Sequence, residues 1–188
     1  MLALLPEWQS VWVAGNKGGA VPIPCVTMRN KNDIDYRLGH SGAVAVVTTA
    51  SEVGKVSDTV PVRVCIGDAA GWDNFEEELK HHSPEFSAAT VAAEDPAIMF
   101  YTSGSTGMPK GVLHASRGLF SWRVSAWYWL SLTEGDVMWC TADTGWSKAG
   151  TSILYAPWGG GATGLFYDAP FCVEQRLAPL RASPVHAY

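Results

Sequence analysis

The chain has 188 residues, of which 47% are hydrophobic and 16% charged, and its formal net charge is −5. This composition is typical of a folded globular protein and excludes an intrinsically disordered one. The negative charge argues against a broad nucleic-acid-binding surface, so we expect no nucleic-acid partner. No apolar stretch approaches the roughly 20 residues of a membrane span, and the N-terminus lacks a basic signal-peptide region, so the sequence predicts a cytoplasmic protein.

The four cysteines, Cys25, Cys65, Cys140 and Cys172, are far apart in the sequence. Metal and redox sites usually have closely spaced cysteines, often with histidines nearby. We therefore predict buried free thiols in a reducing compartment.

The first predicted helix begins near Pro6, which suits a first helical turn, and ends at the glycine pair 18–19. Before it, the apolar stretch 2–5 resembles the end of a buried strand. A second helix is expected with Asn30 or Asn32 as its N-cap, since short polar side chains favour that position.

Two β-branched runs, residues 43–48 and 62–67, are bounded by turn residues and predict buried strands. Asp73 is the expected N-cap of a short acidic helix that ends in the exposed pair His81–His82. Residues 83–96 have weak periodicity and predict a connecting loop.

The second half continues the alternation of strands and helices. We expect strands at 97–101, 111–115, 136–140 and 162–167, helices at 116–130, 145–157 and 173–182, a glycine turn at 159–161 and a strand beginning near 184. Alternating elements of this kind predict an α/β fold with a mainly parallel sheet and flanking helices. The apolar stretches at the two ends suggest a piece of a larger sheet.

The segment YTSGSTGMPKG, residues 101–111, follows an apolar strand and is the most informative part of the sequence. Its glycines allow close backbone approach or positive φ, and successive free N–H groups form an anion-binding concavity. With its hydroxyl groups and a lysine, the segment suits a polyphosphate. A plain glycine–serine hairpin turn would not need all these groups together.

Two common phosphate motifs do not fit this segment. A P-loop requires Ser or Thr directly after a Gly-Lys pair, whereas Lys110 follows Pro109 and precedes Gly111. The dinucleotide-binding pattern G-x-G-x-x-G fails as well, because the gap between Gly104 and Gly107 is wrong.

The segment YTSGSTGMPKGV resembles the phosphate-binding signature of the adenylate-forming superfamily, which includes acyl-CoA synthetases, peptide-synthetase adenylation domains and luciferases. The stretches LPEWQSVWVAGNKGGAVPIPC and YRLGHSGAVAVVTT are similar to early helix–strand units of that superfamily. MWCTADTGWSKAGTSILYAPWGGGATGLFYD is similar to the acetyl- and medium-chain acyl-CoA synthetase branch. The resemblance covers nearly the whole chain and implies part of the large N-terminal domain.

Membership would imply a two-step reaction with ATP, Mg²⁺, a carboxylic or fatty acid and coenzyme A. The acid would attack the α-phosphorus of ATP, pyrophosphate would leave, and the coenzyme A thiol would then displace AMP. The protein would mainly stabilise charge and position the reactants. The residues that the resemblance assigns to the ATP phosphates are Thr102, Ser103, Gly104, Ser105, Thr106, Gly107 and Lys110.

The resemblance also assigns Trp146 and Ser147 to an acyl and pantetheine pocket, although Trp146 could instead only pack at a helix start. Lys148 could extend to solvent or meet the coenzyme, and the sequence does not decide between these. His114 is predicted to be a packed core histidine rather than a catalytic base.

Later motifs of the superfamily are missing: the adenine and metal-binding segment, the ribose-binding aspartate, the hinge and the C-terminal domain with its lysine. We therefore expect no catalytic residue in residues 1–188 and an inactive chain of low stability on its own. The alternatives are a non-catalytic remnant that binds ATP weakly, or an adenylation module for another acceptor. The identity of the acid and the oligomeric state are left open.

Overall fold

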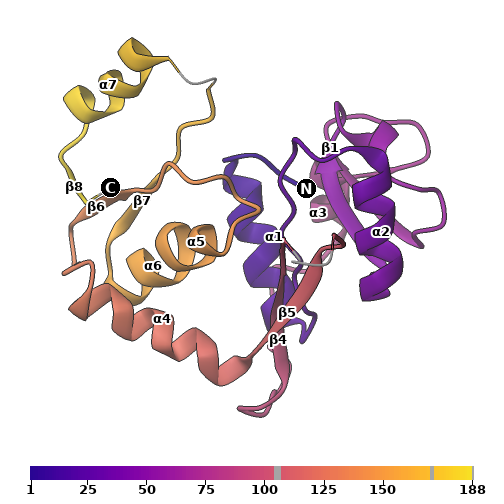
Figure 1. The fold of residues 1–188 in the computed structure, drawn as a ribbon, viewed down its shortest axis with the longest axis horizontal. Helices are drawn as coiled ribbons and strands as arrows, with labels where there is room; N and C mark the ends of the chain where they lie inside the picture. Colours follow the sequence, from indigo (N-terminus) through magenta and orange to yellow (C-terminus); the bar gives the residue numbers. More distant parts are fainter. Residues whose placement is uncertain (104–106, 170–171, 188) are drawn as a thin grey trace.

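The computed structural model describes residues 1–103, 107–169 and 172–187 (Figure 1). The helices are α1 (Pro6–Lys17), α2 (Lys31–Ser41), α3 (Phe75–His81), α4 (Ser116–Tyr128), α5 (Ser147–Ala149), α6 (Ala156–Gly160) and α7 (Val173–Ala182), with a 3₁₀ turn η1 (Val53–Lys55) and a π-helical segment η2 (Gly150–Tyr155). The strands are β1 (Ala45–Thr49), β2 (Val62–Ile66), β3 (Asp73–Asn74), β4 (Pro96–Thr102), β5 (Lys110–Ala115), β6 (Val137–Trp139), β7 (Thr163–Leu165) and β8 (Val185–Ala187).

These strands form one antiparallel hairpin and two parallel sheets, the latter in the orders β1-β2-β3 and β7-β6-β8. The parallel pairing predicted from the alternation of strands and helices is therefore confirmed. The hairpin is β4–β5, in which Tyr101 pairs with Gly111 and Thr102 with Lys110. A short connection can only join antiparallel neighbours, whereas the parallel strands need longer crossovers.

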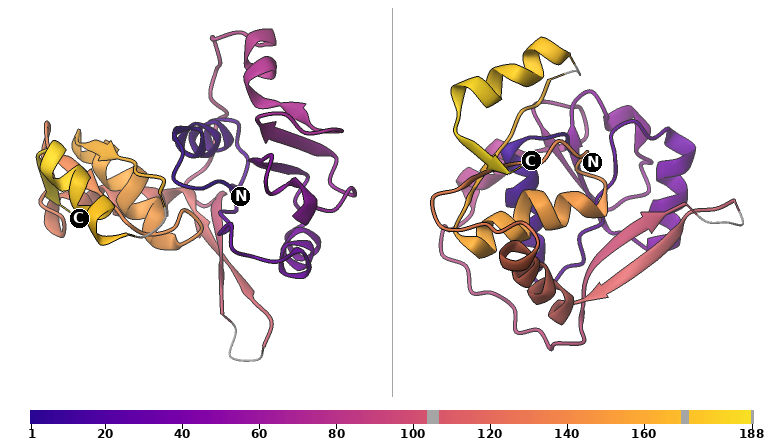
Figure 2. Two further views of the ribbon diagram at one scale, coloured as in Figure 1. Left: turned by 90° about the horizontal axis from the view of Figure 1, so that it is seen from above. Right: turned by 60° about the vertical axis from the view of Figure 1, so that its left-hand side comes forward.

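The two helical connections of the β7-β6-β8 sheet lie on opposite faces of that sheet. The chain passes from β6 to β7 through α5, η2 and α6, and from β7 to β8 through α7. Both figures place α7 on one side of these strands and α5 and α6 on the other (Figures 1 and 2). The loops that follow the neighbouring strands β6 and β7 therefore diverge, and such a point is where open α/β sheets often form a crevice.

The main core packs α1 against the hairpin and against the α5–η2 region. Its buried members are Leu2, Trp8, Trp12, Ile98, Phe100, Cys140, Ala149, Ile153 and Leu154. The rings of Trp8 and Trp12 meet edge to face at 4.6 Å between centroids. A second cluster, between α4 and the β6 region, contains Ala126, Leu132, Met138, Ala156 and Ala162. Burial of these aromatic and aliphatic groups is the main stabilising contribution that joins the elements.

Most predicted elements are present with nearly the predicted bounds. Helix α1 starts at Pro6 and ends before Gly18, and α7 covers residues 173–182 as expected. Of the two candidate caps of α2, Asn30 is the one used, since its Oδ1 accepts from the Asp33 N–H at 2.9 Å. Residues 83–95 contain no helix or strand, in agreement with the predicted loop.

Some predictions about local structure were wrong. Asp73 lies in β3, and its neighbour Asn74 caps α3 by accepting from the Glu77 N–H at 3.0 Å. The expected turn at 159–161 is mostly helical, because α6 continues through Gly160 and only Gly161 has a left-handed φ, of 79°. In the first case two adjacent residues are equally suited to the cap, and in the second the helix runs two residues into the expected turn.

The N-terminal segment is not a strand either. Side-chain hydrogen bonds replace the ladder that a strand would form, because the Thr48 hydroxyl donates to the Met1 carbonyl at 2.9 Å and the Thr144 hydroxyl donates to the Leu2 carbonyl. Leu2 is nevertheless buried in the main core. Its apolar side chain therefore indicated burial correctly, although the expected strand conformation was wrong.

Candidate functional site

The predicted phosphate-binding residues that the structure describes lie where strand β4 ends and strand β5 begins. Thr102 ends β4 and Lys110 begins β5, and the two are cross-strand partners. The described residues Thr102, Ser103, Gly107 and Lys110 are all exposed. Gly107 has a φ of 100°, a conformation that favours glycine, and no atom of the described residues lies within 4 Å of the position that a Cβ would occupy. Gly104, Ser105 and Thr106 lie outside the described residues.

Helix α2 contacts both flanks of this segment, which the sequence did not predict. The Tyr36 hydroxyl donates to the Pro109 carbonyl at 3.0 Å, and His40 Nδ1 lies 2.8 Å from the Tyr101 hydroxyl. These contacts join residues 61 to 73 positions apart, so only the folded structure brings them together. A sequence signal exists in retrospect: Tyr36 and His40 are four residues apart and therefore share a helix face.

The predicted acyl-pocket residues lie elsewhere, where the chain enters α5 after β6. Trp146 is the N-cap residue of α5, with 63% of its surface exposed, and Ser147 is exposed beside it. The Asp143 side chain accepts from the Gly145 N–H at 2.9 Å and shapes the turn. In both views of Figure 2, the free end of the hairpin points away from α5, so the two predicted sets occupy separate parts of the chain.

The turn before Trp146 is fixed by close backbone packing. A Cβ at Gly145 would lie 2.2 Å from the Val26 nitrogen and 2.7 Å from the Cys25 carbonyl carbon. No side chain fits at such distances, so glycine is required where the turn meets the segment before α2. This contact positions Trp146 relative to the rest of the chain.

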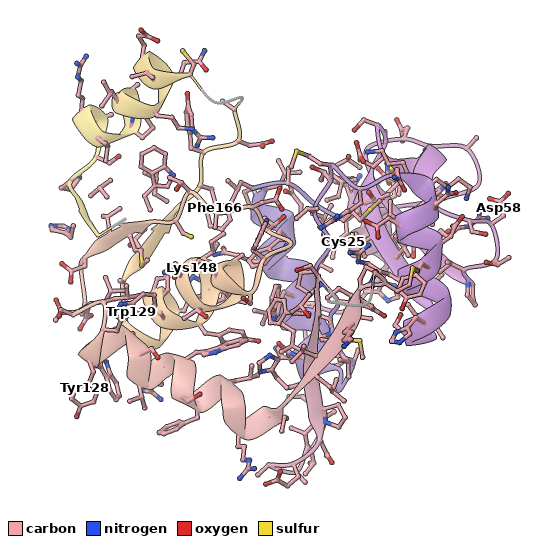
Figure 3. All side chains as sticks on the ribbon, viewed as in Figure 1. Cys25, Asp58, Tyr128, Trp129, Lys148 and Phe166 are labelled. Atoms are coloured by element: carbon pink, nitrogen blue, oxygen red, sulfur yellow. The ribbon has the colours of Figure 1, made fainter. Side chains whose placement is uncertain are left out.

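Lys148 is exposed, which fits the first of the two alternatives that the sequence left open. Its ammonium lies 3.9 Å from the centroid of the Trp129 ring, a cation–π contact between α5 and the end of α4 (Figure 3). His114 packs its ring against Phe100 and Trp122, at 5.7 Å between centroids in both cases. This agrees with the predicted packing role of His114.

A cavity of about 210 Å³ lies where the loops after β6 and β7 diverge. Its lining residues are Ala3, Leu4, Thr27, Thr141, Asp143, Thr144, Tyr167, Asp168, Ala169 and Arg176. Arg176 Nη2 donates to the Ala169 carbonyl at 3.1 Å, while its Nε and Nη1 are buried without a hydrogen-bond partner among the described residues. The guanidinium stacks near Tyr167 and Trp139, which stabilise it in this position. The sequence gave no indication of this cluster.

All four cysteines are free thiols, as predicted, but they are not all buried. Cys65 and Cys140 are buried, whereas Cys25 and Cys172 are partly exposed. Burial raises the pKa of Cys25 and of Cys140, so both thiols are protonated at neutral pH and are poor nucleophiles. Cysteine chemistry is therefore not assigned to either position.

The sequence matches the AMP-binding enzyme family over residues 1–180. The chain belongs to that family. Among its relatives, the human mitochondrial acyl-coenzyme A synthetase ACSM5 is 37% identical over 180 residues, which is 90% of this chain and 31% of the relative. The acyl–CoA ligase YtcI of Bacillus subtilis is 32% identical over 194 residues, covering 100% of this chain and 36% of that protein.

The fold of this AMP-binding chain is also found among solved structures. An acyl-CoA synthetase from Brucella canis superposes with a TM-score of 0.90 at 24% identity, over 98% of this chain and 35% of that one. The predicted N-terminal domain fold is therefore confirmed. The chain spans about a third of the length of the relatives it matches. In the part that the structure describes, no helix is long and apolar enough to cross a membrane.

Proposed function

We propose that this chain carries the ATP phosphate-binding hairpin and part of the acyl pocket of an AMP-forming acyl-CoA ligase. The observation that supports it most directly is the end of the hairpin, where the described residues Thr102, Ser103, Gly107 and Lys110 are all exposed. The similarity to proteins named as acyl-CoA synthetases and ligases favours coenzyme A as the acceptor over another thiol.

In the proposed reaction, hydroxyl and backbone N–H groups of the hairpin hold the β- and γ-phosphates of ATP. Lys110 places a positive charge beside them and acts as a cation rather than as a nucleophile. Pyrophosphate leaves as the carboxylate of a carboxylic or fatty acid attacks the α-phosphorus. The hairpin then stabilises the charge that accumulates on the leaving group, which is the kind of stabilisation that lowers such barriers.

The proposed acyl and pantetheine pocket involves Trp146 and Ser147. Trp146 is exposed on a turn held by Asp143 and by the close contact of Gly145, so its ring is available to an apolar ligand. Lys148 is engaged by Trp129, and we do not include it in the pocket.

Mg²⁺ is proposed as the companion of ATP, but the described residues do not supply a site for it. No group of three or more His, Cys, Asp or Glu side chains among them could hold a metal ion. We therefore derive no step through Mg²⁺ from these residues.

The test is Lys110→Ala in the full-length protein, measured by acid-dependent exchange between ATP and pyrophosphate. Loss of a charge-assisted phosphate contact costs about 1.5–3 kcal/mol, which corresponds to roughly a tenfold to hundredfold loss of exchange at subsaturating ATP. Lys80→Ala is the matched control, because Lys80 is an exposed lysine on α3 that forms an ion pair with Glu77. If Lys110→Ala slowed thioester formation from preformed acyl-adenylate and left exchange unchanged, the assigned role would be wrong.

A further inference from the structure

The two contacts that α2 makes with the hairpin lie on either side of the proposed phosphate-binding residues. Tyr101 precedes Thr102 and Ser103, and Pro109 precedes Lys110. His40 contacts the Tyr101 hydroxyl at 2.8 Å, and Tyr36 donates to the Pro109 carbonyl at 3.0 Å. Helix α2 is therefore bonded to the strand that enters the turn and to the segment that leaves it.

The aromatic rings reinforce these hydrogen bonds. The rings of Tyr36 and His40 are stacked at 5.4 Å between centroids, and His40 meets Tyr101 edge to face at 5.6 Å. The Arg37 guanidinium lies 5.2 Å from the centroid of the Tyr101 ring. Arg37 is itself buried and forms an ion pair with Asp33, so it holds one side of Tyr101 in place.

Gly111, the cross-strand partner of Tyr101, lies next to His40. A Cβ at Gly111 would lie 3.7 Å from His40 Cε1, an ordinary van der Waals distance, and 2.9 Å from Met99 Sδ, so the flexible Met99 side chain would have to shift. Burial raises the pKa of Tyr101, which keeps its hydroxyl protonated and able to donate, for example to the Arg37 carbonyl at 3.4 Å.

We propose that Tyr36 and His40 are positioning residues that hold Thr102 and Lys110 in the geometry in which they receive the ATP phosphates. The inference rests on the function proposed above. The two side chains act through Pro109 and Tyr101 and are not required to touch the nucleotide. They reduce the freedom of the hairpin end before ATP binds, so less ordering is needed on binding.

The test uses Tyr36→Phe and His40→Ala in the full-length protein, with KM for ATP, KM for the acid and kcat measured in the exchange reaction. Tyr36→Phe keeps the ring stacked on His40 and removes only the hydroxyl. The loss of one neutral hydrogen bond should raise KM for ATP about two- to tenfold in each variant, with KM for the acid unchanged. His40 is exposed, so His40→Ala is compatible with folding even if Tyr36→Phe is not.

Two further variants separate positioning from a general loss of stability. His40→Asn places an amide where Nδ1 lies and should restore most of the affinity for ATP. Tyr155→Phe also removes a hydrogen-bonded tyrosine hydroxyl, but this hydroxyl bonds Trp12 and Asn16 of α1, and Asn16 meets β4 at Ala97, at the opposite end of the strand from Thr102. The variant should therefore lower the unfolding temperature without a selective change in KM for ATP.

The outcomes are distinct. If Lys110→Ala raises KM for ATP and the Tyr36 and His40 variants do not, the positioning role is wrong and the proposed function stands. If all variants, including Tyr155→Phe, change every kinetic constant in proportion to their stability, the contacts are structural only and the inference fails. If Lys110→Ala has no effect on ATP, the proposed function itself fails.

Discussion

Tyr155 offers a test of the core through the pH dependence of stability. Its hydroxyl accepts from Trp12 Nε1 at 2.9 Å and donates to Asn16 Oδ1, while Asn16 Nδ2 donates to the Ala97 carbonyl at 2.8 Å. This chain of bonds joins η2 to α1 and α1 to β4. Burial raises the pKa of Tyr155 to about 12, from 10.0 for an unperturbed tyrosine.

The sign of the effect follows from proton binding. Above pH 10 the unfolded chain releases the Tyr155 proton and the folded chain keeps it, so unfolding becomes more favourable as pH rises. The free energy of unfolding should fall by about 1.4 kcal/mol per pH unit in this range, which amounts to about 2.7 kcal/mol by pH 12. This stabilisation is fully present below pH 10. The figure is an upper limit because the side chain retains some contact with solvent.

The assay compares urea unfolding of the chain with that of Tyr155→Phe across this alkaline range. At neutral pH the variant should lose about 1–3 kcal/mol, because Trp12 and Asn16 each lose a partner. Between pH 10 and about 12 the difference between the two proteins should shrink, since only the parent carries the titrating hydroxyl. A difference that stayed constant over that range would show that Tyr155 is not shielded in the core, and the reasoning would be refuted.

Two further substitutions test local structure by thermal or urea unfolding. Asn30→Ala removes the cap of α2 and should cost about 0.5–2 kcal/mol, whereas Asn32→Ala, at the second residue of the same helix, should have little effect. Equal losses would contradict the capping role. Gly145→Ala places a Cβ against the Val26 backbone and should cost about 1–3 kcal/mol or more. As a control, Gly118→Ala in α4 places a Cβ where no atom of the described residues lies within 4 Å and should stabilise by about 0.5–1 kcal/mol. A neutral Gly145→Ala would mean that the turn is not fixed there.

The sequence predicted the features that depend on local chemistry. The β-branched runs at 45–49 and 62–66 form strands because such residues suit a buried pleated surface, and Asn30 caps α2 because its side chain reaches a nearby N–H. The residue pattern predicted the strands at 97–101 and 111–115, and family resemblance singled out the segment between them and Trp146. These predictions need only neighbouring residues or a continuous motif.

Features that depend on distant partners could not be predicted. An apolar residue such as Leu2 can be buried in a strand or in an irregular segment. Here the segment is irregular, and its carbonyls at Met1 and Leu2 accept hydrogen bonds from the hydroxyls of the distant Thr48 and Thr144. The contacts of Tyr36 with Pro109 and of Arg176 with Ala169 depend on how helices dock on strands. The propensities of these residues carry no information about such docking.

The structure also places α1 between the two parts of the proposed site. Trp12 and Asn16 connect it to Tyr155, which lies in η2 directly after α5, and Asn16 connects it to β4 through the Ala97 carbonyl. Strand β4 ends at the proposed phosphate-binding residues, and α5 begins beside Trp146. The two parts belong to separate elements, and α1 provides one of the connections between them. Because a buried polar network is stabilising only when all its members are paired, removing any one of these side chains should lower the free energy of unfolding of the chain as a whole.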